Sequence, residues 1–182
     1  MPLTIRPATK SDIPQILQFI HDLATYEREP QAVVATEADL LRDGFGPTPR
    51  FHCLIAELPP TTNQHPTTTN QPVGFALYFH NYSTWRAHHG IHIEDLYVHP
   101  AQRGQGIGKA LLTRIAAIAA AEGCPRLQWD VLEWNTPAIG FYEQMGAHML
   151  TQWRTMRITN EAIPALAAQS DSVSPNSPTN LK

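Results

Sequence analysis

The sequence predicts an α/β fold in which helices cover a mixed sheet. Segments with apolar residues at helical spacing alternate with short, turn-bounded apolar segments that are typical of strands. In addition, a glycine-rich turn joins one predicted strand directly to the clearest helix. The predicted order along the chain is β, α, α, β, β, β, α, β, α, β, which favours one layer of sheet packed against helices.

Helical spacing of apolar residues is clearest over residues 107–122, and Gly123 follows as the expected C-terminal residue. Thr36 and Asp39 have the spacing of a capping box that starts a second helix. Two more helices are expected at residues 11–26 and at residues 136–145. Asn160 is expected to cap a short final helix.

Strands are predicted where apolar and aromatic residues are bounded by turns, at residues 3–6, 51–58, 73–80, 91–98 and 127–131. One or two further strands are expected within residues 148–158. Strands 51–58 and 73–80 should pair as a hairpin although the connection is long, because the entropy cost of closing a loop grows only logarithmically with its length.

The 182 residues are predicted to form a single domain over residues 1–168. Residues 59–72 are rich in proline, threonine and asparagine and hold no Asp, Glu, Lys or Arg, so they predict an inserted loop. Residues 169–182 are rich in serine, proline and asparagine and predict a disordered tail.

Composition excludes several classes of protein. Hydrophobic residues make up 42% of the chain, which excludes wholesale disorder. The net charge of −3 argues against a nucleic-acid partner that needs a broad basic face. Two cysteines cannot form a disulfide scaffold, and no apolar run approaches the roughly 20 residues of a membrane span. With no signal-peptide core at the N-terminus, we expect a cytoplasmic protein with no membrane partner.

The glycine-rich turn at residues 103–109 predicts a phosphate-binding site. Unpaired amides at the start of a helix attract anions, and glycines let an anion approach the backbone closely. Arg103 and Lys109 add positive charge there. A P-loop is excluded because Arg103 stands where its first glycine is required, and a dinucleotide fingerprint beginning at Gly104 is excluded because Lys109 takes the place of its last glycine. The alternative is a glycine-rich turn that only starts a helix.

The pattern of Arg103, Gly106 and Gly108 resembles the R-x-x-G-x-G pyrophosphate signature of the GCN5-related N-acetyltransferases, which use acetyl-CoA. Further blocks between residues 3 and 168 are similar to the diamine (spermidine/spermine) acetyltransferases: residues 5–9, 23–27, 43–46, 51–57, 82–85, 93–98 and 133–142. The resemblance implies that family's fold, a mixed and mostly antiparallel central sheet flanked by helices. It also implies acetyl-CoA as cosubstrate, a small-molecule amine substrate and a homodimer.

The resemblance also implies roles in catalysis. Glu94 would accept the proton of the amine, and Tyr142 would protonate the sulfur of CoA as a general acid. The alternatives are an exposed strand carboxylate and a core aromatic beside Phe141. Glu94 and Asp95 are neighbours in a strand, so their side chains should point to opposite faces of the sheet, and the role of Asp95 stays open.

The remaining predicted site residues fall into two groups. Cofactor-binding residues are expected to be Leu96, Tyr97, Val98, Arg103, Gly104, Gln105, Gly106, Ile107, Gly108, Lys109, Asn135, Thr136, Pro137 and Ala138, together with Tyr142. Substrate-binding residues are expected to be Tyr26, Glu27, Trp85, Gln128, Trp129 and Asp130, together with Glu94 and Asp95.

Three functional hypotheses stay open. In the first, the enzyme acetylates a di- or polyamine. In the second, it acetylates thialysine or a related amino acid, because Ser83 and Thr84 before Trp85 resemble the thialysine-preferring branch. The third reading is a CoA-binding module without catalysis. The nine histidines show no spacing typical of a metal site, so no metal is expected.

Overall fold

The structure, a computed structural model, describes residues 3–60 and 70–170. The chain divides into two compact units, residues 1–141 and residues 142–182, and each is described by itself. The expected tail falls almost entirely outside the described residues, as does most of the expected 59–72 insertion. The single domain over residues 1–168 stays a prediction.

The first unit contains a five-stranded sheet in the order β1-β2-β3-β4-β5. Its strands are β1 (Thr4–Pro7), β2 (His52–Leu58), β3 (Gln71–Ser83), β4 (His88–Val98) and β5 (Leu127–Trp129). Neighbouring strands pair antiparallel except β4 and β5, which are parallel. The predicted hairpin of β2 and β3 and the mixed, mostly antiparallel sheet are therefore confirmed.

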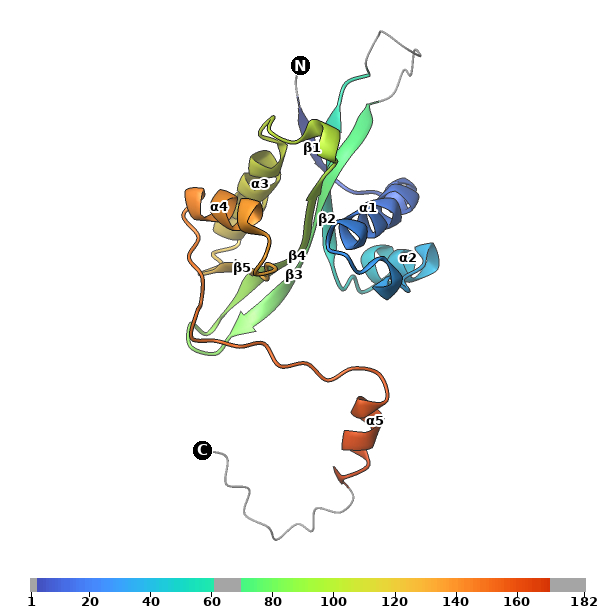
Figure 1. Ribbon diagram of the computed structural model, residues 1–182, viewed down its shortest axis with the longest axis vertical. Helices are drawn as coiled ribbons and strands as arrows, with labels where there is room; N and C mark the ends of the chain where they lie inside the picture. The colour runs from blue at the N-terminus through green and yellow to red at the C-terminus, as the bar shows by residue number, and fades with distance from the viewer. Residues whose placement is uncertain (1–2, 61–69, 171–182) are drawn as a thin grey trace. The chain divides into compact units, whose positions relative to one another are not determined.

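Helices cover both faces of this sheet. They are α1 (Ile13–Tyr26), α2 (Glu37–Phe45), α3 (Ile107–Ala121) and α4 (Thr136–Gln144), with 3₁₀ turns at Lys10–Asp12, Pro30–Ala32 and Pro100–Gln102. Helices α1 and α2 lie on one face and α3 on the other (Figure 1). The predicted capping box opens α2, where the Asp39 amide donates to the Thr36 hydroxyl and the Thr36 amide donates to the Asp39 carboxylate.

The core follows the predicted apolar faces. Phe19 of α1 stacks on Phe75 of β3 with ring centroids 5.6 Å apart, and both side chains are buried. On the other face, Leu111 and Ile115 of α3 are completely buried. Helix α3 ends where Gly123 takes a left-handed φ of 70°. Helices α1 and α3 therefore each bury one apolar stripe against the sheet, which is how the sequence pattern specifies the layers.

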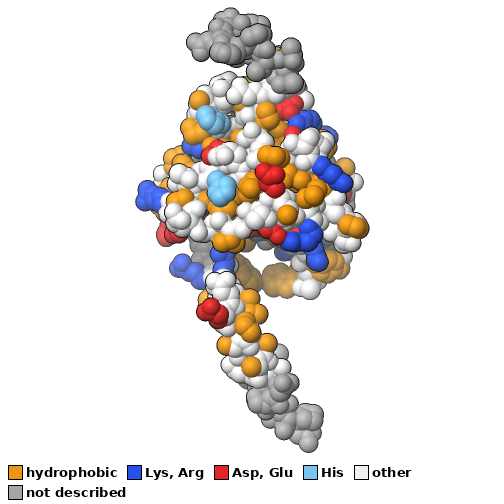
Figure 2. Space-filling view, turned by 90° about the vertical axis from the view of Figure 1, so that its right-hand side faces the viewer, with side chains coloured by type: hydrophobic (Ala, Val, Ile, Leu, Met, Phe, Trp, Pro, Cys, Tyr) orange, Lys and Arg blue, Asp and Glu red, His pale blue; other side chains and the backbone are white. Residues whose placement is uncertain are grey.

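The face that carries α1 and α2 shows basic, acidic and hydrophobic side chains interspersed, with no continuous basic patch (Figure 2). That distribution agrees with the small negative net charge. Among residues 3–60 and 70–170, no helix has the length and apolar content that crossing a membrane requires.

The second unit holds the end of α4 and the short helix α5 (Ala162–Ala167). Two expectations are wrong here. Residues 148–158 form no strand in the described chain, although their pattern is apolar, because a strand needs a partner for its backbone groups. Asn160 does not cap the final helix, since α5 begins after Glu161 and Asn160 takes a left-handed φ of 51°.

A carboxylate pair around one arginine connects β1, β2 and the start of α1. Arg6 donates to Asp12 at 2.7 and 2.8 Å and to Glu57 at 2.9 Å, and both carboxylates are buried. Hydrogen bonds from Arg6 are the main cause that lowers the pKa of Asp12 from 3.8 to about 2.

We expect Asp12 to make stability depend on pH at the acid end. Because its folded-state pKa lies below the unfolded value, its contribution is complete above about pH 4 and is lost as the pH falls toward 2. The shift corresponds to about 2 kcal/mol. Urea unfolding should show Asp12→Asn destabilised by that amount at pH 7 and close to wild type near pH 2. The exposed substitution Glu29→Gln serves as the control, and an equal loss at both pH values would contradict the ion-pair origin.

Candidate active site

A β-bulge in β4 places the predicted proton acceptor. Leu77 pairs with Asp95 and Tyr78 pairs with Ile93, so Glu94 is an extra residue without a partner on β3. The expected alternation of Glu94 and Asp95 across the sheet is therefore wrong, because the bulge shifts the pattern by one residue. Glu94 is exposed and Asp95 is half-buried.

Three carboxylates interact at this bulge. Burial, together with the negative charges of Glu94 and Glu27, raises the pKa of Asp95 to about 7. Burial also raises the pKa of Glu27, which follows the end of α1. We call Glu27, Glu94 and Asp95 the carboxylate cluster. Such a cluster favours a cation and can hold a proton near neutral pH.

His92 connects this cluster to β5. Its Nδ1 lies 3.3 Å from the amide nitrogen of Gln128, and its Nε2 lies 3.9 Å from Glu94 Oε2. The ring stacks on Phe79 at 5.0 Å. The sequence predicted Gln128 and Glu94 as substrate-binding residues, and the structure brings both to His92.

Tyr26, a predicted substrate residue, contacts two predicted cofactor residues. Its hydroxyl donates to Asn135 Oδ1 at 2.9 Å, and the Arg103 guanidinium lies 4.8 Å from its ring centroid. The Arg103 Nε also donates to the Val98 carbonyl at 2.9 Å. Arg103 therefore ties the glycine-rich turn to the end of β4 and to the end of α1, in addition to supplying charge.

The start of α3 is open to solvent and fits an anion. Gly104 and Gly106 have left-handed φ values of 76° and 79°, and a Cβ added at either would meet no atom within 4 Å. Gly104, Gln105, Gly106 and Lys109 are exposed, whereas Ile107 is buried in the core. The helix has 15 residues, so a full set of unpaired N-terminal amides faces the open space. These residues fit the diphosphate of acetyl-CoA.

The other predicted cofactor residues lie around this turn. Leu96, Tyr97 and Val98 form the end of β4, and Tyr97 is buried under the Arg103 guanidinium, 5.8 Å from its ring centroid. Thr136, Pro137 and Ala138 open α4, and the Phe141 ring comes within 3.8 Å of the Cβ position of Gly108. Helix α4 therefore approaches the start of α3 through Phe141. Tyr142 follows Phe141 in α4 and belongs to the second unit.

Three predicted substrate residues lie on or beside strands β3, β4 and β5. Trp85 lies in the turn between β3 and β4 and is 87% exposed. Glu94 lies six residues into β4, about 20 Å along the strand from that turn. Trp129 ends β5, where it pairs with Ile93, the residue before Glu94 in β4, and the exposed Asp130 follows it.

Two residues of the site were missed from the sequence. Trp134 packs against Tyr26 with ring centroids 5.8 Å apart, and the Arg28 guanidinium lies 4.5 Å from the Trp134 ring centroid. Arg28 has a left-handed φ of 68°, which is uncommon outside glycine. The sequence signal that could have identified Arg28 and Trp134 is that each is next to a predicted site residue, Glu27 and Asn135 respectively.

The sheet thus carries an exposed glycine-rich turn at the start of α3 and a carboxylate cluster at the bulge of β4. The model of the acetyltransferase (GNAT) family matches residues 18–147. The chain therefore belongs to the GNAT acetyltransferase family, whose members use acetyl-CoA, and it is an N-acetyltransferase.

Similar proteins support this assignment. A thialysine N-epsilon-acetyltransferase of Bos taurus is 41% identical, over 91% of this chain and 97% of its own length. An L-ornithine N5-acetyltransferase of Arabidopsis thaliana is 33% identical, over 89% of this chain and 86% of its own. Among solved structures, an integron cassette protein from Vibrio cholerae matches with a TM-score of 0.72 at 24% identity, covering 92% of this chain and 98% of that one. It shows the same fold.

We expect Gly106→Ala to weaken CoA binding more than Gly104→Ala. Both substitutions put a Cβ at a left-handed φ, which costs about 1 kcal/mol in each case. Only Gly106 is the N-cap of α3, so only there does the added methyl stand at the helix amides. Calorimetry should show roughly a tenfold loss of CoA affinity for Gly106→Ala, at equal stability of the two variants. Equal affinities would contradict the cradle.

Proposed function

We propose that this enzyme transfers the acetyl group of acetyl-CoA to the side-chain amine of a small amino acid of the thialysine type. The carboxylate cluster of Glu27, Glu94 and Asp95 carries the proposal, because a cationic amine is the ligand that such a cluster favours. Relatives named as thialysine and L-ornithine acetyltransferases support an amino acid as substrate. A relative named spermidine/spermine N(1)-acetyltransferase-like protein 1 keeps the polyamine as the alternative.

The chemistry requires a neutral amine. For an amine with a lysine-like pKa of about 10.4, deprotonation at pH 7 costs about 4.6 kcal/mol. A carboxylate at the nitrogen offsets part of this cost by accepting the ammonium proton before the nitrogen attacks. We assign this role to Glu94 through a water molecule, and Asp95 holds the proton within the cluster because its pKa is near 7.

The transfer proceeds directly within a ternary complex. The amine nitrogen attacks the thioester carbonyl carbon, and the C–S bond breaks as the amide forms. The ammonium proton goes to the carboxylate cluster before the attack, and the second proton that the nitrogen loses as the amide forms goes to water, from which the phenolate left at Tyr142 is reprotonated. The sulfur of CoA takes a proton from the Tyr142 hydroxyl, since a phenol with a pKa near 10 is protonated at neutral pH. The α3 amides and Lys109 hold the diphosphate, and the end of β4 together with Asn135 and the start of α4 hold the pantetheine arm.

A panel of amines tests the substrate. Thiol release from acetyl-CoA is measured with thialysine, L-ornithine and spermidine, and kcat/KM should be highest for thialysine. A spermidine value equal to or above that of thialysine would overturn the amino-acid assignment. If no amine accelerates thiol release while calorimetry shows CoA binding, the protein is a CoA-binding module and the catalytic assignment is wrong.

We also propose that the enzyme is a homodimer. Residues 149–158 of the second unit expose several large apolar side chains: Met149, Leu150, Trp153, Met156 and Ile158. Apolar side chains gathered in this way mark a surface that another protein covers. A second copy of the chain is the occupant that the family resemblance implies.

Sedimentation velocity at micromolar concentration should therefore give a dimer for the wild type and a monomer for Trp153→Glu. Val34→Glu, at an exposed apolar residue of the first unit, should stay dimeric. A monomeric wild type would overturn this proposal.

A further inference from the structure

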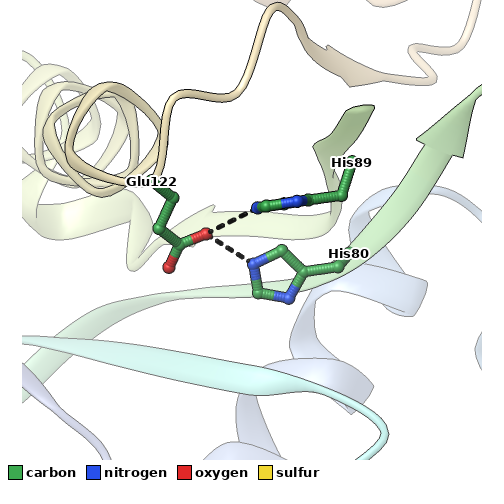
Figure 3. A group of neighbouring side chains, drawn as sticks. All are labelled: His80, His89 and Glu122. Atoms are coloured by element: carbon green, nitrogen blue, oxygen red, sulfur yellow. Dashed lines mark hydrogen bonds and ion pairs between the residues drawn. The ribbon is translucent and has the colours of Figure 1, made fainter. Parts of the chain in front are cut away.

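Three side chains from three elements meet on the face of the sheet that α3 covers. His80 comes from β3, His89 from β4, and Glu122 is the C-cap residue of α3. The His80 Nε2 lies 2.7 Å from Glu122 Oε2, and the His89 Nε2 lies 3.6 Å from the same oxygen. Figure 3 shows both imidazoles pointing at the one carboxylate. We call these residues the His–His–Glu triad.

Strand register explains why the two histidines share a face. His80 pairs with Ile91, so these two side chains lie on one face of the sheet. His89 is two residues before Ile91 and lies on that same face because side chains alternate along a strand. The end of α3 then brings Glu122 over both rings.

The triad has the donors and the spacing of a zinc site. Two imidazole nitrogens and one carboxylate oxygen form a donor set that zinc uses in proteins, and bonds of about 2.0–2.2 Å to tetrahedral zinc place donor atoms about 3.3 Å apart. The two distances to Glu122 Oε2, 2.7 and 3.6 Å, lie on either side of that value. One donor atom from each of the three residues lies within 4.8 Å of the others.

The surroundings favour a cation and hold the rings in place. Glu122 stands at the C-terminal end of a 15-residue helix, where the last carbonyls carry partial negative charge. His88 stacks on His89 at 4.4 Å, and the His52 ring meets the His80 ring edge-on at 5.6 Å. These contacts orient the rings, as the neighbours of metal-binding histidines do in known sites.

We propose that His80, His89 and Glu122 bind one zinc ion, with water in the fourth position. The metal replaces the hydrogen bond between His80 and Glu122. It connects the end of α3 to the hairpin of β3 and β4. Because α3 also begins with the glycine-rich turn, the ion would fix one end of the helix whose other end holds the cosubstrate.

Zinc titration of the full chain tests the site. Protein treated with a chelator and freed of it is titrated with zinc chloride in a non-chelating buffer, and calorimetry should give one zinc per chain. Each of His89→Gln and Glu122→Gln should weaken zinc binding roughly 100-fold, since each removes one of three protein ligands. His21→Gln is the matched control, because His21 is exposed on α1 at the opposite face of the sheet.

Two further readouts separate a metal site from a structural hydrogen bond. Zinc should raise the melting temperature of the wild type and of His21→Gln but not that of the two ligand variants. Cobalt substitution should give the visible absorption of a tetrahedral site in the wild type only. No zinc binding by the wild type, or unchanged zinc affinity in both ligand variants, would overturn the proposal.

Discussion

Asp95→Asn should produce an enzyme that is more stable and much less active than the wild type. The Asp95 carboxyl is half-buried at the bulge and faces the charges of Glu94 and Glu27, which together raise its pKa to about 7. The charged form of Asp95 therefore lowers the stability of the folded protein, but it attracts a cationic amine. We expect kcat/KM to fall roughly 100-fold in Asp95→Asn, the lower end of what one proton-transfer group contributes.

Asp95 gives the wild type two pH dependences of opposite sign, one in activity and one in stability. In the wild type, kcat/KM should rise with pH and level off above about pH 7, as Asp95 loses its proton. Its folded-state pKa lies above the unfolded value, so the stability linked to Asp95 is complete below about pH 4 and is lost as the pH rises through 7. Asp95→Asn should remove both dependences.

Urea unfolding at pH 5 and pH 8, together with a pH profile of kcat/KM, measures both effects. At pH 8 the variant should be about 4 kcal/mol more stable than the wild type, because it avoids the cost of the buried charge. Glu37→Gln, at an exposed carboxylate of α2, should leave both profiles unchanged. A variant with wild-type kcat/KM would show that Asp95 is a structural carboxyl.

The sequence predicted the layers and most of the helices and strands well, because local patterns specify them. The buried stripe of α3 and the capping box at Thr36 each lie within a few residues of chain. The glycine-rich turn is equally local, and the structure gives Gly104 and Gly106 the left-handed φ values that only glycine adopts easily.

What the sequence did not predict depends on register and on distant parts of the chain. The bulge at Glu94 arises from how β3 and β4 pair, and no residue type in β4 signals it. Likewise, His80, His89 and Glu122 are separated by 9 and 33 residues, so no metal-binding spacing shows in the chain. The strand prediction at residues 148–158 is wrong because an apolar pattern does not supply the partner strand that a β-strand needs.

Within the site, too, local patterns predicted some roles, whereas long-range contacts determined others. Arg103 was predicted from the motif as a positive charge, whereas its hydrogen bond to the Val98 carbonyl and its stacking on Tyr26 required the fold. Trp134 and Arg28 were missed because their contact joins the end of α1 to the segment before α4. Residues that act through long-range contacts are therefore the ones that a single sequence conceals.

Tyr142→Phe is expected to lower kcat by roughly 100- to 1000-fold, within the range of general-acid catalysis. The substitution removes one hydroxyl and keeps the ring, so the packing of α4 should change little. If the hydroxyl protonates the departing sulfur, KM for acetyl-CoA should stay close to its wild-type value while kcat falls. Tyr82→Phe makes the same chemical change at an exposed residue of β3 and should have wild-type kinetics.

Changing the thiol leaving group of the substrate distinguishes a general-acid role of Tyr142 from a structural role. An acetyl thioester with a more acidic thiol needs less protonation as its C–S bond breaks. The loss in kcat caused by Tyr142→Phe should therefore shrink with such a substrate, and it should stay the same if the variant only disturbs the position of α4. A Tyr142→Phe enzyme with wild-type kcat on acetyl-CoA would assign the protonation of sulfur to another group or to water.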